Sequence, residues 1–223
     1  MTSGAVRFFD AIVGRYDRVY ALSSAESRVR LARVISHLPP APARLLDLGV
    51  GTGRELPALL DAGYAVTGLD ASQPMLEKCA RRARPIPLVH ADFWRLPLPF
   101  EPASFDAAVA LHGTLAHPPG PDAVSALGRD LARVVRSGGT FVAEVPSPAW
   151  LDVLDRAGPP PEGTVRRTGP RACVYEDQAT GATIEARLLD ATEWRAAFDR
   201  RAGWECRVEP AGDVEWIVVA RRT

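Results

Sequence analysis

Short apolar runs alternate along this chain with stretches whose apolar residues recur at helical spacing. Each run is too short for a surface helix and is typical of a parallel strand that is buried on both faces. The pattern predicts strands at 44–48, 65–69, 86–90, 105–111 and 140–145, and helices at 54–62, 72–83 and 122–135. Strands that alternate with helices indicate βαβ units with right-handed crossovers. We therefore expect an α/β fold around a mostly parallel sheet.

The two ends of the chain depart from this alternation. Helical spacing predicts helices at 5–20 and 24–37; Ser23 or Ser24 can cap the second helix. After Pro146 the pattern changes, and the stretch from the prolines at 159–161 to Gly169 has the composition of a loop. The remaining predicted elements are a hairpin of strands 172–177 and 183–189, a helix at 192–202 capped by Thr192, and strands at 204–209 and 215–220.

Composition narrows the class of protein. The 223 residues suit one domain, and 47% hydrophobic residues supply a sizeable core. Equal numbers of basic and acidic residues, 27 of each, argue against a general nucleic-acid-binding protein. The cysteines form no CxxC pair and no metal-ligand spacing with the histidines, which favours free thiols in a reducing cytoplasm. No secretory signal or membrane-spanning apolar run is evident, so we expect a cytoplasmic protein without membrane or metal sites.

A glycine-rich turn follows the first predicted strand, in the run LLDLGVGTG at 45–53. The next predicted strand ends at Asp70. A strand, a tight glycine turn, a helix and a second strand with an acid at its tip bind the ribose and the charged tail of a nucleoside-like cofactor. The pattern here is GxGxG, and Arg54 stands where a dinucleotide fold needs a third small residue. A cofactor without a pyrophosphate therefore fits better than NAD or FAD.

Five motifs in this order resemble those of the small bacterial class I S-adenosylmethionine-dependent methyltransferases. They are LLDLGVGTG, TGLDAS followed by Met75, HADFWRLP, FDAAVALHGTLAH and LARVVRSGGTFVAEV. The resemblance covers roughly 44–150 and, more loosely, the rest of the chain. It implies a doubly wound, Rossmann-like sheet of seven strands in the order 3-2-1-4-5-7-6, mostly parallel with the last strand antiparallel, plus N-terminal lid helices and a hairpin insertion. It also implies S-adenosyl-L-methionine as the cofactor.

The resemblance assigns cofactor contacts as well. Asp70 would accept both ribose hydroxyls, and Asp92 would accept the adenine amine. Tyr16 would close over the methionine part, although core packing at helical spacing explains it equally well. Asp47 would hold the methionine ammonium or, alternatively, brace the turn. The other implied contacts are Gly49, Gly51 and Gly53 around the methionine and ribose, Ala71 and Met75 beside the adenine, the backbone of Phe93, and Leu111 near the sulfonium.

Two histidines are the candidate catalytic residues. Methyl transfer from a sulfonium depends mainly on alignment, and a base is needed only if the nucleophile must lose a proton. His112 and His117 follow the fourth predicted strand, at the sheet edge where open α/β proteins bind ligands. A purely structural hydrogen bond is the alternative role for each. Residues that would line an acceptor pocket, or alternatively serve in packing, are Glu144, Trp150, Tyr175 and Glu176.

A local basic cluster lies near the predicted hairpin, at Arg166, Arg167 and Arg171. It would either recognise an acidic acceptor or remain solvated. The HPPG sequence at 117–120 lacks the flanking residues of the motif found in methylases of nucleic-acid amines, so it predicts a turn. No nucleic-acid partner is therefore expected.

We interpret the chain as one domain with four parts: lid helices (1–43), a cofactor-binding core (44–150), an acceptor-covering insertion (151–190) and a C-terminal helix with strands (191–223). The predicted activity is methyl transfer to an O, N or C nucleophile of a small organic molecule, by a monomer or homodimer. One alternative is a cofactor-binding protein of this fold without transfer. The other is an NAD-dependent oxidoreductase, for which the only lysine, Lys78, is poorly placed.

Overall fold

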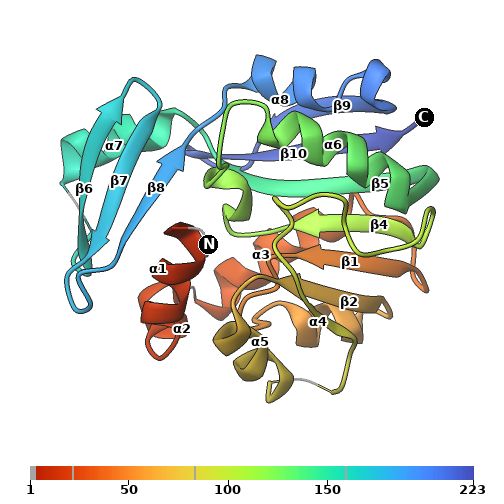
Figure 1. Cartoon of the computed structure of the whole chain (residues 1–223), viewed down its shortest axis with the longest axis horizontal. Coiled ribbons are helices and arrows are strands. Elements are labelled where there is room, and N and C mark those ends of the chain that lie inside the picture. The colour runs from red at the N-terminus through yellow and green to blue at the C-terminus, as the bar shows by residue number, and fades with distance from the viewer. Residues whose placement is uncertain (1–3, 22, 83, 159) are drawn as a thin grey trace.

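A seven-stranded sheet forms the centre of the computed structural model, which describes residues 4–21, 23–82, 84–158 and 160–223 (Figure 1). The strand order is β3-β2-β1-β4-β5-β10-β9. β3, β2, β1, β4 and β5 pair in parallel, and β10 is antiparallel to both neighbours. The strands are β1 (Arg44–Leu48), β2 (Ala65–Asp70), β3 (Leu88–His90), β4 (Phe105–Ala110), β5 (Val135–Pro146), β9 (Trp204–Pro210) and β10 (Glu215–Arg222). The implied Rossmann-like order, with its antiparallel last strand, is confirmed.

Helices cover both faces of this sheet and bury its apolar side chains. One core packs Leu127, Leu131 and Trp194 against the sheet, and the other packs Leu31 and Leu59 against the opposite face. Burial of this kind is the main stabilising term of the fold. The helices are α3 (Ser24–Ile35), α4 (Leu56–Asp61) and α5 (Gln73–Ala80) on the second face, and α6 (Ala123–Val134) and α8 (Ala191–Ala197) on the first.

Side-chain caps decide where several helices begin. Ser23 and Glu26 form a reciprocal capping box on α3, and Ser72 accepts the backbone N–H of Met75 at the start of α5. The prediction that Thr192 caps the last helix is wrong, because the carboxylate of Asp190 caps it instead and α8 begins at Ala191. That helix also ends earlier than predicted, at Ala197, and a 3₁₀ turn, η2 (Arg200–Ala202), follows.

A second, three-stranded antiparallel sheet lies at one end of the molecule, beside the N-terminal helices (Figure 1). The predicted hairpin is confirmed, but the interpretation of the stretch before Gly169 as a loop is wrong. Polar residues such as Arg166 and Arg167 face solvent there, so the strand shows no apolar alternation, and backbone pairing with β7 holds it in place. The elements are α7 (Ala149–Ala157), β6 (Gly163–Gly169), β7 (Ala172–Asp177) and β8 (Thr183–Arg187).

The predicted helix at 5–20 is divided into two, α1 (Gly4–Ile12) and α2 (Tyr16–Val19). A turn separates them, in which Arg15 N–H donates to the Ile12 carbonyl. α1 contacts both β8 and α5, so these helices bridge the small sheet and the large one. Two predicted positions, Ala83 and Pro159, lie outside the described residues. Within the described part of the chain, every helix is too short or too polar to cross a membrane.

Candidate active site

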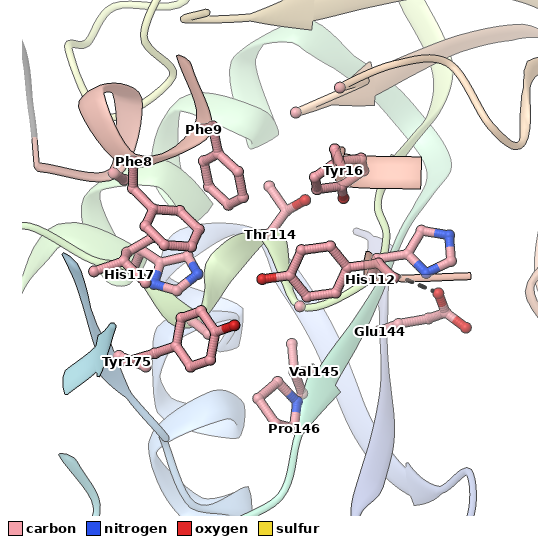
Figure 2. A pocket seen from close by; sticks show the side chains of 18 of the residues that line it. Phe8, Phe9, Tyr16, His112, Thr114, His117, Glu144, Val145, Pro146 and Tyr175 are labelled. Carbon is pink, nitrogen blue, oxygen red and sulfur yellow. Dashed lines mark hydrogen bonds between the residues drawn. The ribbon is translucent and has the colours of Figure 1, made fainter. Parts of the chain in front are cut away.

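A cavity of about 520 Å³ opens where β1, β2, β4 and β5 end, beneath α1 and α2 (Figure 2). One end, which we call the glycine-turn end, is bordered by Gly49, Gly51, Asp70 and Asp92. The other, the small-sheet end, is bordered by Phe8, Phe9, His117, Trp150 and Tyr175. The cavity has the size of a small-molecule site and lies at the sheet edge where α/β proteins bind ligands.

The glycine turn between β1 and α4 brings bare backbone to the cavity wall. Gly49, Gly51 and Gly53 have φ angles of 69°, 55° and 73°, a region that side chains disfavour. A Cβ at Gly51 would meet nothing nearer than the Gly49 carbonyl oxygen at 3.9 Å, so this glycine leaves open space beside the cavity. Gly53 instead packs closely on Cys79 and Leu56, and among the described residues it does not border the cavity.

Asp70 ends β2 and faces the glycine turn. One carboxylate oxygen accepts the Gly51 N–H at 2.8 Å, and the other accepts the Ser72 N–H at 2.9 Å. Burial raises the pKa of Asp70, and these backbone hydrogen bonds oppose the rise. Each carboxylate oxygen has a further lone pair, so the group can also accept two hydroxyls from a diol in the cavity.

Asp47 lies on β1, behind the glycine turn, and is 5% exposed. Burial raises its pKa to about 8, and the neighbouring charges of Asp70 and Glu55 add to the effect. Asp47 is not among the described residues that border the cavity, so its contact with a methionine ammonium stays a prediction. A cation placed beside a carboxyl group with this pKa would stabilise its ionised form.

The remaining predicted cofactor contacts divide into two groups. Ala71, Met75, Asp92 and Phe93 border the cavity at the glycine-turn end, and Asp92 accepts the Trp94 N–H at 3.0 Å. Leu111 is buried, and within the described chain it lies behind the cavity wall rather than on it. Its carbonyl accepts the hydroxyl of Thr114 at 2.7 Å, which fixes the loop after β4.

His112 lies in the loop after β4 in a strained conformation, with a φ angle of 53°. Glu144 holds this conformation: its carboxylate accepts the His112 N–H at 3.2 Å, as the dashed line in Figure 2 shows, and its carbonyl accepts the Gly113 N–H at 3.1 Å. The His112 ring is engaged elsewhere, with Nε2 2.7 Å from a carboxylate oxygen of Glu55 and Nδ1 3.1 Å from Arg54. Its side chain is therefore already committed to neighbouring residues.

His117 follows the short 3₁₀ turn η1 (Thr114–Ala116) and reaches the other end of the cavity. Its Nδ1 donates to the backbone carbonyl of Glu185 on β8 at 2.7 Å. Its ring meets the ring of Phe9 edge-on, with centroids 6.0 Å apart. Burial lowers the pKa of His117, so the neutral ring is favoured at neutral pH.

Tyr16, at the start of α2, borders the cavity and also packs against its neighbours. Its ring lies 6.1 Å from that of Phe9 and 4.9 Å from that of Tyr20, and the guanidinium of Arg54 lies 5.8 Å from its centroid. Burial raises the pKa of Tyr16, and the charge of Arg54 partly opposes this. The position of Tyr16 is compatible with both interpretations, and its role as a lid stays a prediction.

Polar contacts that the sequence did not reveal fasten the N-terminal helices over the glycine turn. Asp17 accepts the Thr52 hydroxyl at 2.6 Å and pairs with Lys78 at 2.8 Å and with Arg82. Asp10 accepts the Ser72 hydroxyl at 2.5 Å. These partners are far apart in the sequence, and a single amino-acid sequence contains no pattern that predicts which of them will interact.

The small-sheet end contains some of the predicted pocket residues and lacks others. Glu144, Trp150 and Tyr175 border the cavity, whereas Glu176 and the basic cluster do not, within the described residues. Arg167 pairs with Asp152 at 2.7 Å, and Arg171 pairs with two acidic residues outside the cavity. Sequence reasoning missed Phe8 and Phe9, whose helical spacing marks them only as apolar positions.

Comparison with known proteins agrees with this geometry. Residues 45–139 match a family described as a methyltransferase domain. A demethylmenaquinone methyltransferase of Corynebacterium kroppenstedtii is 31% identical over 212 residues, which cover 89% of this chain and 86% of that protein. A cypemycin N-terminal methyltransferase from a Streptomyces species is 30% identical, covering 90% of this chain and 81% of that one.

Solved structures share the same architecture. DesVI of Streptomyces venezuelae aligns with a TM-score of 0.72 at 18% identity, over 93% of this chain and 97% of that one, and so shares its fold. One family assignment follows from three observations: the fold, the glycine turn with Asp70, and the extensive similarity to two named methyltransferases. The chain belongs to the class I S-adenosylmethionine-dependent methyltransferase family and uses S-adenosyl-L-methionine as its cofactor.

Proposed function

We propose that this protein moves a methyl group from S-adenosylmethionine to an O, N or C nucleophile of a small organic molecule. The cavity carries this proposal, because it joins the glycine-turn end to a separate apolar end under the same helices. A donor and an acceptor held in one enclosed space can be aligned for in-line displacement. The family assignment removes the NAD-dependent alternative.

Residues at the glycine-turn end fit the cofactor. Asp70 would accept the ribose hydroxyls, Asp92 the adenine amine, and Met75 would contact the adenine face. Gly51 leaves space for the ribose and methionine parts, and Asp47 would hold the ammonium from behind the turn. The cofactor supplies an activated methyl group when bound, and the protein orients it and excludes water.

We assign different roles to the two histidines. His112, held by Glu144 and Glu55, would shape the wall beside the sulfonium and position the acceptor. His117 borders the apolar end, and its Nε2 has no partner in the described structure, so it is the better candidate for a base. The lid residue Tyr16 would exclude water from the methionine part.

The acceptors named for the two relatives differ in chemistry. One acts on a demethylmenaquinone and the other on the N-terminus of cypemycin. The acceptor of this chain must therefore be inferred from its own residues. We take it to be a small molecule rather than a nucleic acid, given the zero net charge, and we expect a cytoplasmic monomer or homodimer.

Calorimetry with S-adenosylhomocysteine is the first test. We expect micromolar binding at one site per chain and no response to NADH. Incubation with methyl-labelled cofactor and a small-molecule cell extract should then yield a labelled product, with the Asp70→Ala protein as the background. A protein that binds S-adenosylhomocysteine but labels nothing in a range of extracts would favour the alternative in which the fold binds the cofactor without transfer.

A further inference from the structure

The small-sheet end of the cavity is built from rings and aliphatic side chains. Phe8 and Phe9 come from α1, Trp150 from α7, and Val165 and Tyr175 from the small sheet. In Figure 2, Phe8, Phe9, His117 and Tyr175 gather on one side of the cavity, opposite His112 and Glu144. Phe8 meets Tyr175 edge-on, with centroids 5.7 Å apart. Walls of this kind favour a flat, largely apolar molecule.

The positively charged side chains that border the cavity lie on its other side, and each is already bound by neighbouring residues. Among the described residues, the cations that border it are Arg30 and Arg54. Arg30 pairs with Glu144 at 3.2 Å and with Glu215 at 3.5 Å, while Arg54 donates to the Tyr20 carbonyl and contacts His112. A carboxylate or phosphate on the acceptor would thus find no free cation among the described residues that border the small-sheet end, and its burial there would be costly.

The hydrogen bond from His117 to the Glu185 carbonyl fixes the proton of the neutral ring. A carbonyl only accepts, so Nδ1 must carry the hydrogen and Nε2 is left with a lone pair. Because burial favours the neutral ring, Nε2 can accept a proton at neutral pH. His117 also borders a second cavity of about 840 Å³ between α1 and β8, which offers the proton a way to water.

We propose that the acceptor is a neutral arene bearing a hydroxyl group and that His117 Nε2 removes the hydroxyl proton during transfer; this rests on the proposed methyltransferase function. The O–H bond breaks with the proton passing to Nε2, the oxygen lone pair bonds to the methyl carbon, and the carbon–sulfur bond breaks with its electron pair going to sulfur. The products are an aryl methyl ether and S-adenosylhomocysteine. The imidazolium then returns its proton to water.

One carboxylate would support a different class of acceptor. Glu162 borders the cavity, and its charge acts on Tyr20 and Tyr175, so an ammonium group bound there would favour N-methylation. Glu162 is half-buried and precedes β6, whereas His117 lies among the rings that would enclose the acceptor. A proton acceptor among rings favours the hydroxyl, and the amine becomes an outcome of the test.

The substrate class is tested with three naphthalenes that differ in one group: a naphthol, the matching naphthylamine and the matching naphthoic acid. We expect the wild-type protein to methylate the naphthol at least about tenfold faster than either analogue, since discrimination of that size follows from one mispaired polar group. Faster transfer to the amine, with a loss on Glu162→Gln, or faster transfer to the acid would overturn the proposal. So would binding of S-adenosylhomocysteine without methylation of the naphthol, a result that leaves the family function intact.

The role of His117 is tested with His117→Asn, whose amide can still donate to the Glu185 carbonyl but offers no base. Turnover of the naphthol should fall by roughly 100-fold or more, the scale of general-base catalysis, with unchanged affinity for S-adenosylhomocysteine. A nitronaphthol that is already ionised at neutral pH should lose less than about tenfold in the same variant, because no proton remains to be removed. Equal losses on both naphthols would refute the proton-transfer role. His37→Asn, in the turn that follows α3, is the matched control.

Discussion

The two ends of the cavity are built from different parts of the chain. The glycine-turn end consists of backbone and side chains that follow β1, β2 and β3 within a few residues, so the sheet itself fixes their positions. The small-sheet end collects long side chains from α1, α7 and β7, which are far apart in the sequence. One end therefore tolerates little change in shape, whereas the other can be altered without disturbing the central sheet.

The largest expected effect comes from crowding the glycine-turn end with Gly49→Ala. A Cβ there would lie 2.5 Å from Thr114 Cγ2, and Thr114 cannot swing away without breaking its bond to the Leu111 carbonyl. The positive φ angle adds about 1–2 kcal/mol of strain and the overpacking roughly another 1–3 kcal/mol. Urea unfolding should show a corresponding fall in the free energy of unfolding. Adding Thr114→Ala should restore the packing part only, and a fully stable single variant would show that the turn is not rigid.

Asp70→Ala should act on binding more than on folding. Loss of charge-assisted hydrogen bonds to the ribose should weaken S-adenosylhomocysteine binding by about 1–3 kcal/mol, a factor of roughly 5–150 in Kd. Because Asp70 also holds the Gly51 and Ser72 N–H groups, Asp70→Asn should retain part of the affinity. Calorimetry measures both, and unchanged affinity in the alanine variant would disprove the ribose assignment.

The contrast between the two ends of the cavity also explains which features the sequence could predict and which it could not. The glycine turn, the acid at Asp70 and the cap at Ser72 depend on neighbours within one βαβ unit, so the local pattern was enough to predict them. The strand order spans the whole sheet, and it came from the family resemblance. β6 escaped prediction because its polar residues face solvent on a small outer sheet, and α7 escaped because prolines precede and follow it.

Side-chain partners between distant segments also escaped prediction. The tautomer of His117 depends on a carbonyl of β8, and the His112 ring is engaged by Glu55 from the start of α4. Such pairs have no spacing rule, because the fold alone brings them together. Most of the candidate residues border the cavity, whereas their hydrogen-bonding states could not be predicted from the sequence.

Asp47→Asn should have opposite effects on folding and on binding. The pKa of Asp47 rises on folding from its ordinary 3.8 to about 8, so the native state is favoured most below the lower value and loses stability as the pH rises through this window. The Tm of the variant should therefore exceed that of the wild type increasingly between pH 5 and 8. The difference should be about 2–4 °C for each kcal/mol of difference in the free energy of unfolding. Its affinity for S-adenosylhomocysteine should fall if Asp47 holds the ammonium. A constant Tm difference across this pH range would contradict the assigned burial cost.

The smallest expected effect lies where Asp17 fastens the N-terminal helices over the glycine turn. Burial alone would raise its pKa, but hydrogen bonds from Lys78 and Thr52 and the charge of Arg82 outweigh this and lower it, so the group stays ionised and paired. Asp17→Asn should weaken the attachment of the N-terminal helices to the glycine turn by about 1 kcal/mol. The loss is no larger because these ion pairs are partly exposed. That loss should appear as roughly fivefold faster release of S-adenosylhomocysteine and faster tryptic cleavage near Arg15, with the exposed Asp61→Asn as control. If release is unchanged while cleavage rises, these helices cover the acceptor alone, and the glycine-turn end holds its ligand without them.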